Sequence, residues 1–225
     1  MNYRHAFHAG NFADVFKHAI LTGLIESLKA KQTPFRYFDT HAGAGRYDLR
    51  GEQARKTREH EAGVQRLLDA VRLPATLHIY LNLVRALNTG NKASDIANYP
   101  GSPLIASVLM RDTDRATLCE IQADETAQLK KLFAGDGRIS VHERDGYAAI
   151  KALLPPKHGA TRFARGLVLI DPPFEAQLAE FDTALAALAE GLARWPQAIY
   201  ALWYPIKQRR ALHPFRRAAA KLPAK

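Results

Sequence analysis

The chain has 225 residues, which is enough for one large α/β domain or for one domain with an insertion. Apolar residues make up 47% and charged residues 24%, which excludes a disordered or fibrous chain. The 32 Lys and Arg against 22 Asp and Glu give a formal net charge of +10, which favours a polyanionic partner, although a generally basic proteome would give the same excess.

The N-terminal residues and the cysteine count bear on location. The first residues have no apolar stretch of the kind a signal peptide needs, and no apolar run reaches the length of a membrane span. Cys119 is the only cysteine, so no intramolecular disulfide can form. We expect a cytoplasmic protein without a membrane partner.

The first segment of the chain predicts a helix, a strand and a turn. Apolar residues spaced by three and four indicate a helix over residues 12–31, and Pro34 follows its end. Residues 35–38 form a short aromatic strand that runs into the turn 39–45.

Residues 46–101 have a different pattern. They begin with a highly charged stretch, and apolar positions over 64–71 and 77–87 predict two helices. Residues 88–100 then read as a polar loop. We expect the whole region to be a helical insertion.

From residue 102 onward, strands alternate with helices. Ser102 and Pro103 are a plausible cap and first-turn residue of the first of these helices. Apolar strands separated by helices predict a parallel, doubly wound sheet, whose ligands bind beyond the carboxyl ends of the strands. The predicted strands are 116–121, 139–142, 166–170 and 199–203, and the predicted helices are 104–110, 124–133, 147–154 and 181–193.

Four predicted strands end near an acidic residue. Asp39, Glu120, Asp145 and Asp171 are these acids. Together they indicate a crevice that binds hydroxyls, amines or a cation, although each alone can be a helix cap. Gly43, in the turn after the first strand, lets the backbone approach a ligand, and an acid after the next strand is placed to hold a ribose diol.

The sharpest motif is Asp171-Pro-Pro-Phe174 after a continuous apolar strand. The prolines rigidify the turn and leave the Asp171 side chain and the Pro172 carbonyl as hydrogen-bond acceptors. Phe174 offers a face on which a base can stack. The motif predicts a pocket for an aromatic amine; the alternative is a strand-ending turn with a core phenylalanine.

Two basic segments suit RNA. Cations and aromatic residues alternate at the N-terminus, which fits phosphate contact and stacking, although the segment could be a frayed end. The tail from Pro205 carries seven Lys and Arg and no acid, so it either binds phosphates or forms a solvated helix face. Nine histidines occur without cysteine pairs or an H-E-x-x-H motif, so we predict no metal site.

Several blocks resemble one family. Tyr3-Arg-His-Ala-Phe-His-Ala-Gly-Asn11, Asp39 to Tyr47, Tyr99-Pro-Gly-Ser-Pro103, Asp171 to Phe174 and Ala201-Leu-Trp-Tyr-Pro205 are similar to motifs of the bacterial 23S rRNA adenine-N6 methyltransferases. The resemblance implies a Rossmann-like methyltransferase fold over residues 1–45 and 102–225, with the inserted helical subdomain at 46–101. Relatives continue beyond residue 225, so we expect the last strands of the sheet to be missing.

The resemblance also implies roles for individual residues. The methyl donor would be S-adenosylmethionine, the substrate an adenine of 23S rRNA at position 2030 in the usual bacterial numbering, and the protein a monomer. The catalytic residues would be Asp171, Pro172 and Phe174. The cofactor-binding residues would be Lys17, His18, His41, Gly43, Ser102, Glu120, Asp145, Gly146 and Asp171, and the RNA-binding residues Tyr3, Arg4, His5, His8 and Phe174.

The sequence is also compatible with three other functions. The protein could methylate DNA adenine or a protein amide. It could be a non-catalytic RNA-binding relic of the fold, although Glu120, Asp145 and Asp171 are all present. A metal-dependent hydrolase is the third reading.

Overall fold

The computed structural model forms two compact units, each of which is described by itself. It describes residues 4–74, 77–90, 96–159, 161–174, 177–206 and 209–224. Unit 1 comprises residues 1–31, 42–111 and 127–135. Unit 2 comprises residues 32–41, 112–126 and 136–225.

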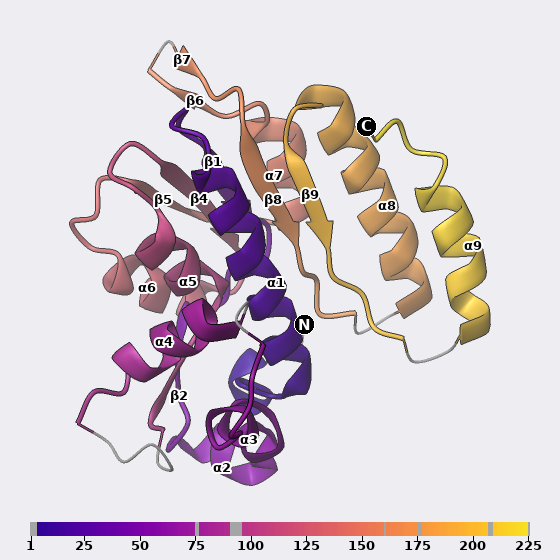
Figure 1. Ribbon diagram of the computed structural model, residues 1–225. Helices are drawn as coiled ribbons and strands as arrows, with labels where there is room; N and C mark the ends of the chain where they lie inside the picture. Colours follow the sequence, from indigo (N-terminus) through magenta and orange to yellow (C-terminus); the bar gives the residue numbers. More distant parts are fainter. Residues whose placement is uncertain are drawn as a thin grey trace. The chain divides into compact units, whose positions relative to one another are not determined.

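Unit 2 is built on a five-stranded sheet in which every neighbouring pair is parallel (Figure 1). The strand order is β5-β4-β1-β8-β9. In chain order this is 3-2-1-4-5, so the direction of winding reverses between β1 and β8, where doubly wound sheets bind their ligands. The strands are β1 (Arg36–Asp39), β4 (Arg115–Glu120), β5 (Ile139–Glu143), β8 (Gly166–Ile170) and β9 (Ile199–Leu202).

Helices α7 (Gly146–Leu153) and α8 (Gln177–Arg194) pack together and cover apolar side chains of this sheet. Alternate residues along a strand point to one face, which is why Val168 and Ile170 of β8 join the same buried cluster as Ile150 of α7. Helix α9 (Arg209–Ala219) lies against α8 (Figure 1). Unit 2 also contains a short antiparallel pair, β6 (Lys157–His158) and β7 (Thr161–Arg162).

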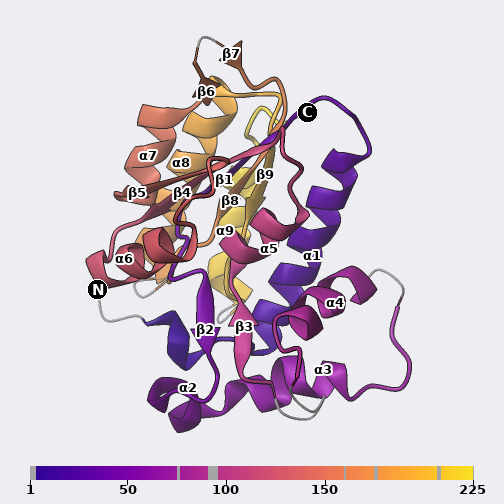
Figure 2. The same cartoon turned by 90° about the vertical axis from the view of Figure 1, so that its left-hand side faces the viewer.

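Unit 1 combines helices with one short antiparallel pair. The pair joins β2 (Arg46–Asp48) to β3 (Asn98–Pro100) (Figure 2). The long helix α1 (Phe12–Lys29) contacts α5 (Ser102–Leu109) and α4 (His78–Ala86). The smaller helical elements are η1 (His5–Phe7), α2 (Glu52–Thr57), the π-helix η2 (Glu61–Gln65) and α3 (Arg66–Leu68), and α6 (Ala123–Leu132) has residues in both units.

The structure confirms the Rossmann-like α/β fold and its predicted strands. Two local predictions were wrong. The polar loop expected over 88–100 ends in β3, a strand of three residues that is too short to show a periodic pattern. The cap of α5 is Gly101 and not Ser102, because the Gly101 amide hydrogen bonds to the Gly45 carbonyl at 2.9 Å and so fixes the chain one residue earlier.

The insertion predicted at 46–101 lies within unit 1, and its two predicted helical stretches correspond to η2 with α3 and to α4. The predicted domain boundaries stay a prediction. In the part of the chain that the structure describes, no helix is long and apolar enough to cross a bilayer.

Candidate functional site

Four acids stand at the carboxyl edge of the sheet in unit 2. Asp39 ends β1, Glu120 ends β4, Asp171 directly follows β8 and Asp145 follows β5 by two residues. These four strands are consecutive neighbours in the sheet, so their carboxyl ends share one edge. The sequence prediction that the acids gather at a single edge is confirmed.

Asp39 has a structural role at this edge. Its side chain is fully buried, and the Tyr37 hydroxyl donates to Asp39 Oδ2 at 2.6 Å. The His41 amide donates to Asp39 Oδ1 at 3.2 Å. The carboxylate therefore fixes the direction in which the chain leaves β1.

Glu120 and Asp145 are both oriented by backbone amides. The Gln122 amide donates to Glu120 Oε1 at 2.8 Å, and the Glu120 side chain is buried. The Ala148 amide donates to Asp145 Oδ1 at 2.7 Å, which makes Asp145 the N-cap of α7. The capping alternative thus holds for Asp145, whose side chain is nevertheless exposed at the edge.

His41 lies near Asp171 and Asp145 and is uncharged at neutral pH. Burial lowers the pKa of His41 to about 4, and the negative charges of Asp171 and Asp145 only partly oppose this shift. The imidazole Nδ1 is 2.7 Å from the Thr40 hydroxyl, and the ring packs edge-on against Tyr147 with centroids 5.1 Å apart. A neutral ring can donate or accept one hydrogen bond here without repelling a cationic ligand.

The Asp171 turn leaves β8 where the winding of the sheet reverses. The Asp171 side chain is partly exposed and Pro172 is buried. β1 is the neighbour of β8, and the Thr40 amide bonds to the Leu169 carbonyl at 3.1 Å, so the ends of both strands are held together.

Phe174 is placed differently from the expectation of an open stacking face. Its ring is 2% exposed and packs edge-on against Phe181, with centroids 5.4 Å apart, in a cluster with Leu212 and Phe215. The backbone has φ of +50°, a left-handed conformation that turns the side chain inward. The alternative of a core phenylalanine describes this geometry, and the stacking role stays a prediction.

Gly146 locks the start of α7 to the end of β1. A Cβ at Gly146 would lie 2.0 Å from the Thr40 carbonyl oxygen, closer than atoms can approach. Only glycine therefore fits this position. Its contact with the cofactor stays a prediction.

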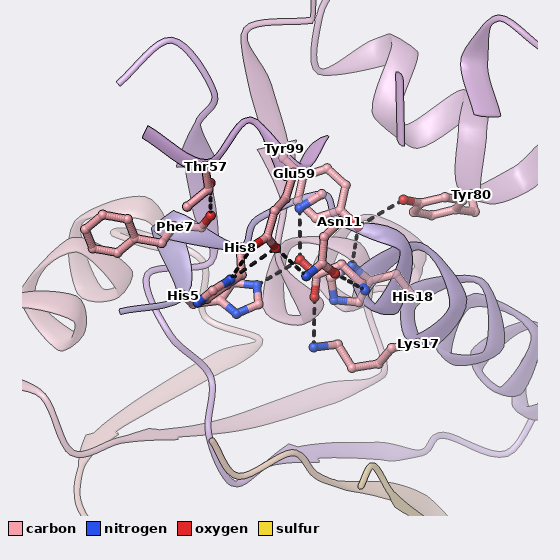
Figure 3. A network of polar contacts seen from close by, with 12 residues as sticks. His5, Phe7, His8, Asn11, Lys17, His18, Thr57, Glu59, Tyr80 and Tyr99 are labelled. Carbon is pink, nitrogen blue, oxygen red and sulfur yellow. Dashed lines mark hydrogen bonds and ion pairs between the residues drawn. The ribbon is translucent and has the colours of Figure 1, made fainter. Parts of the chain in front are cut away.

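In unit 1, the N-terminal block forms a polar network around the buried Asp14. Figure 3 shows its members His5, Lys17 and His18. Lys17 Nζ is 3.0 Å from Asp14 Oδ1, and His5 Nε2 is 2.8 Å from Oδ2. The Gly10 amide donates to the same Oδ2 at 3.0 Å. Burial opposes ionisation of Asp14, but the surrounding His5 and Lys17 hold its pKa well below the ordinary value.

His18 belongs to a second chain of polar groups in this network (Figure 3). Its Nδ1 is 2.8 Å from the Tyr99 hydroxyl, which is 2.9 Å from the Tyr80 hydroxyl. Burial lowers the pKa of His18 to about 3, so the ring is neutral, and burial raises the pKa of both tyrosines. These contacts fix the orientation of the His18 ring.

The residues predicted to touch RNA are largely engaged with the protein. His8 Nδ1 is 3.0 Å from Glu59 Oε1, and the His5 ring packs at 4.9 Å from Tyr47. Arg4 is half-buried at the start of η1, and Tyr3 lies outside the described residues. Their RNA contacts stay a prediction.

Gly43 and Ser102, both in unit 1, are the remaining predicted cofactor residues. Gly43 adopts φ of +60°, which explains why glycine is found in that turn. Ser102 is buried at the first position of α5. Neither observation tests cofactor contact.

Sequence reasoning missed the central roles of Asp14, Tyr80 and Tyr99. The sequence did contain a signal for the position of Asp14. Asn11 is a typical N-cap residue, and an N-cap accepts from the amide three residues later. The structure has this contact, with the Asp14 amide 2.9 Å from the Asn11 side-chain oxygen. Nothing local could reveal Tyr99, which contacts His18 across 81 residues of sequence.

Two further groups bear on chemistry. Among the described residues, no set of three His, Cys, Asp or Glu side chains is arranged to hold a metal ion. Cys119 lies in the core of unit 2, and burial, followed by the nearby Asp39, raises the pKa of its thiol to about 12.

Comparison with known proteins gives consistent matches over most of the chain. The family model described as "Ribosomal RNA large subunit methyltransferase D, RlmJ" matches residues 32–224. The chain is 43% identical to ribosomal RNA large subunit methyltransferase J of Escherichia coli K12, over 94% of this chain and 72% of that protein. It is 42% identical to the protein of the same name from Haemophilus influenzae, over 92% of this chain and 70% of that protein.

A solved structure has the same fold. The crystal structure of a Legionella pneumophila protein superposes with a TM-score of 0.84 at 33% sequence identity. The match covers 96% of this chain and 76% of that one.

Proposed function

Because the chain belongs to the RlmJ family of ribosomal RNA large subunit methyltransferases, we propose that it transfers a methyl group from S-adenosylmethionine to the N6 amine of an adenine in 23S rRNA. The observation that carries the proposal is the position of Asp171-Pro172, at the carboxyl end of β8 beside the reversal of the strand order. A turn that can accept hydrogen bonds from an amine, at the edge where such sheets bind ligands, fits methyl transfer to an amine better than hydrolysis or RNA binding alone.

The edge of unit 2 has the chemistry that the methyl donor requires. S-adenosylmethionine supplies an electrophilic methyl group on a cationic sulfonium. Glu120 would accept the ribose hydroxyls, since its carboxylate is oriented by the Gln122 amide. Asp145 would accept from the adenine amine of the cofactor, and the neutral His41 adds no repulsion. The cofactor contacts of Lys17, His18, Gly43 and Ser102 stay predictions.

Asp171 and the Pro172 carbonyl would act on the substrate amine. The lone pair of N6 is delocalised into the adenine ring, so the amine is a poor nucleophile. Two acceptors that hold its N–H groups favour a more tetrahedral nitrogen, whose lone pair can point at the methyl carbon. Catalysis then comes mainly from positioning. Asp171 can take the proton during or after transfer, because the methylated nitrogen becomes acidic.

The test is methyl transfer to mapped RNA. The protein is incubated with radiolabelled S-adenosylmethionine and 23S rRNA that lacks the modification, and the labelled nucleotide is mapped. Asp171→Ala should lower the rate at least about a hundredfold, the size of effect that loss of a positioned polar group has on catalysis. RNA affinity should stay unchanged. Equal rates for the variant and the parent would overturn the role of Asp171.

The same assay separates the rival functions. Label on a DNA duplex or on a glutamine-containing peptide, with none on rRNA, would show that the substrate is DNA or protein and not RNA. A relic of the fold would bind RNA but not S-adenosylmethionine, which calorimetry measures directly. A metal-dependent hydrolase would transfer no label from S-adenosylmethionine, and a chelator would abolish its hydrolytic activity.

A further inference from the structure

We propose that one face of α9 binds the phosphate backbone of the substrate RNA. We call it the basic face and define it by His213, Arg216 and Arg217 of α9, together with Lys221 in the turn that follows the helix. The inference rests on the proposed function only in its choice of partner, an RNA. It adds a binding surface in unit 2, outside the carboxyl edge of the sheet.

The opposite face of α9 is packed against the protein. Leu212 and Phe215 are 3% and 5% exposed and belong to the buried cluster that contains Phe181 of α8. The rings of Phe215 and Phe181 are 4.5 Å apart (Figure 1 shows α9 beside α8). The helix is thus held in place by its apolar side.

The basic face is exposed and unbalanced by acids. His213 and Arg217 are four residues apart and Arg216 is adjacent to Arg217, so these three share one side of α9. Lys221 lies in the turn that follows Ala219, the last residue of the helix. All four side chains are exposed. No acidic residue occurs in the sequence after Asp182 and Glu190 of α8, and no described acid forms an ion pair with Arg216 or Arg217. The Arg216 Nε donates instead to the Tyr204 hydroxyl at 3.3 Å.

The packing argues for RNA and against other partners of basic amphipathic helices. Such helices bind anionic membranes or helix-binding grooves by burying their apolar face in the partner. Here Leu212 and Phe215 are already buried within unit 2. Only the cationic side is available, and a polyanionic backbone is the partner that cations alone can bind.

Helix α9 also packs against the end of the Asp171-Pro-Pro-Phe174 turn. Phe174, the last residue of the Asp171-Pro-Pro-Phe174 motif, packs in the same cluster as Leu212 and Phe215. RNA phosphates bound by Arg216 and Arg217 would therefore be held at a fixed place relative to that turn. We expect the basic face to contribute to RNA binding and not to the chemical step.

The experiment compares two double variants of equal charge change. Arg216→Gln with Arg217→Gln removes two cations from the basic face. Lys151→Gln with Arg162→Gln removes two exposed cations elsewhere in unit 2. The affinity for a 23S rRNA transcript is measured against salt concentration, together with KM and kcat, the melting temperature and the affinity for S-adenosylmethionine.

The basic-face variant should raise KM for the transcript about tenfold and reduce the slope of log affinity against log salt by about 1 to 2. The control pair should change both far less. Neither pair should alter kcat at saturating RNA, melting or cofactor affinity. Arg216→Lys with Arg217→Lys keeps the charges and should restore the slope.

An unchanged salt slope for the basic-face variant, or an equal loss in the control pair, would overturn the inference. So would binding of the parent protein to vesicles of anionic lipid that the basic-face variant loses while its RNA affinity is kept. Failure of the proposed function would give a different result. The parent protein would not methylate the transcript, while the basic-face variant would still show the weaker RNA binding and the smaller salt slope.

Discussion

The buried network around Asp14 and the acidic edge of the sheet use the same residue types in opposite ways. Asp14 is 2% exposed, and its carboxylate pairs with Lys17 and contacts His5 Nε2 within unit 1. Asp145 is exposed, and its contact is a backbone amide that orients it. A block of polar residues close in sequence can thus be internal structure, whereas Asp145 and Asp171, which follow their strands, keep exposed or partly exposed side chains that can meet a ligand.

The largest effect is expected for a substitution in the buried network around Asp14. Asp14→Asn leaves the ammonium of Lys17, which is 8% exposed, without its carboxylate. Breaking a buried ion pair should lower the free energy of unfolding by about 3–5 kcal/mol. Denaturant unfolding measures it, with Asp145→Asn as the exposed control. Similar losses of unfolding free energy in the two variants would show that the buried and the exposed aspartate contribute equally to stability.

A second variant tests the backbone contact beneath the network. A Cβ at Gly63 would lie 2.1 Å from the Gly10 carbonyl, which accepts from the Val64 amide at 2.9 Å. Gly63→Ala should therefore cost about 2–3 kcal/mol of stability. Gly137→Ala has no atom within 4 Å of the new methyl and is the control. Two equally stable variants would show that the chain relaxes around the contact.

The pH dependence of stability tests the buried network through His18. The pKa of His18 is about 3 when folded and near 6.5 when unfolded, so the unfolded state binds the proton first as pH falls. This group then costs stability progressively below pH 6.5, by about 2 kcal/mol between pH 7 and pH 5. His18→Gln should flatten the curve by that amount. Parallel curves for parent and variant would contradict a buried neutral ring.

The smallest effect sharpens the role of Asp145 at the edge. Serine is also a good N-cap, so Asp145→Ser should keep stability while Asp145→Ala should lose about 1 kcal/mol from α7. Both variants should bind S-adenosylmethionine about tenfold more weakly, because each loses the carboxylate. Calorimetry and thermal melting give the two readouts. Unchanged cofactor affinity in both would leave Asp145 as a cap alone.

The sequence predicted the strand-end acids because they depend on local pattern. An apolar run followed by Asp171 needs only the strand to exist, and parallel order then brings Glu120 and Asp145 to the same edge. The sequence left open whether Phe174 is a stacking face or a core residue, because its burial depends on Leu212 and Phe215, 38 and 41 residues later, packing on the turn.

The network in unit 1 was out of reach for a related reason. Lys17 and His18 were singled out from a resemblance, but the contacts that hold His18 come from Tyr99 and Tyr80 far along the chain. The short strands β2 and β3 were missed because three residues carry no measurable alternation. Predictions succeeded where chemistry follows a regular element and failed where it depends on distant side chains.

The buried Cys119 makes the protein convenient for site-specific spectroscopy. A thiol with a pKa of about 12 is almost never a thiolate at neutral pH, and its burial keeps alkylating reagents away. A cysteine introduced on α9 outside the basic face, such as Ala218→Cys at an exposed position, would be the one thiol that reacts with a spin label or fluorophore. Wild-type Cys119 can stay in place, so distances to labelled RNA can be measured without disturbing the core.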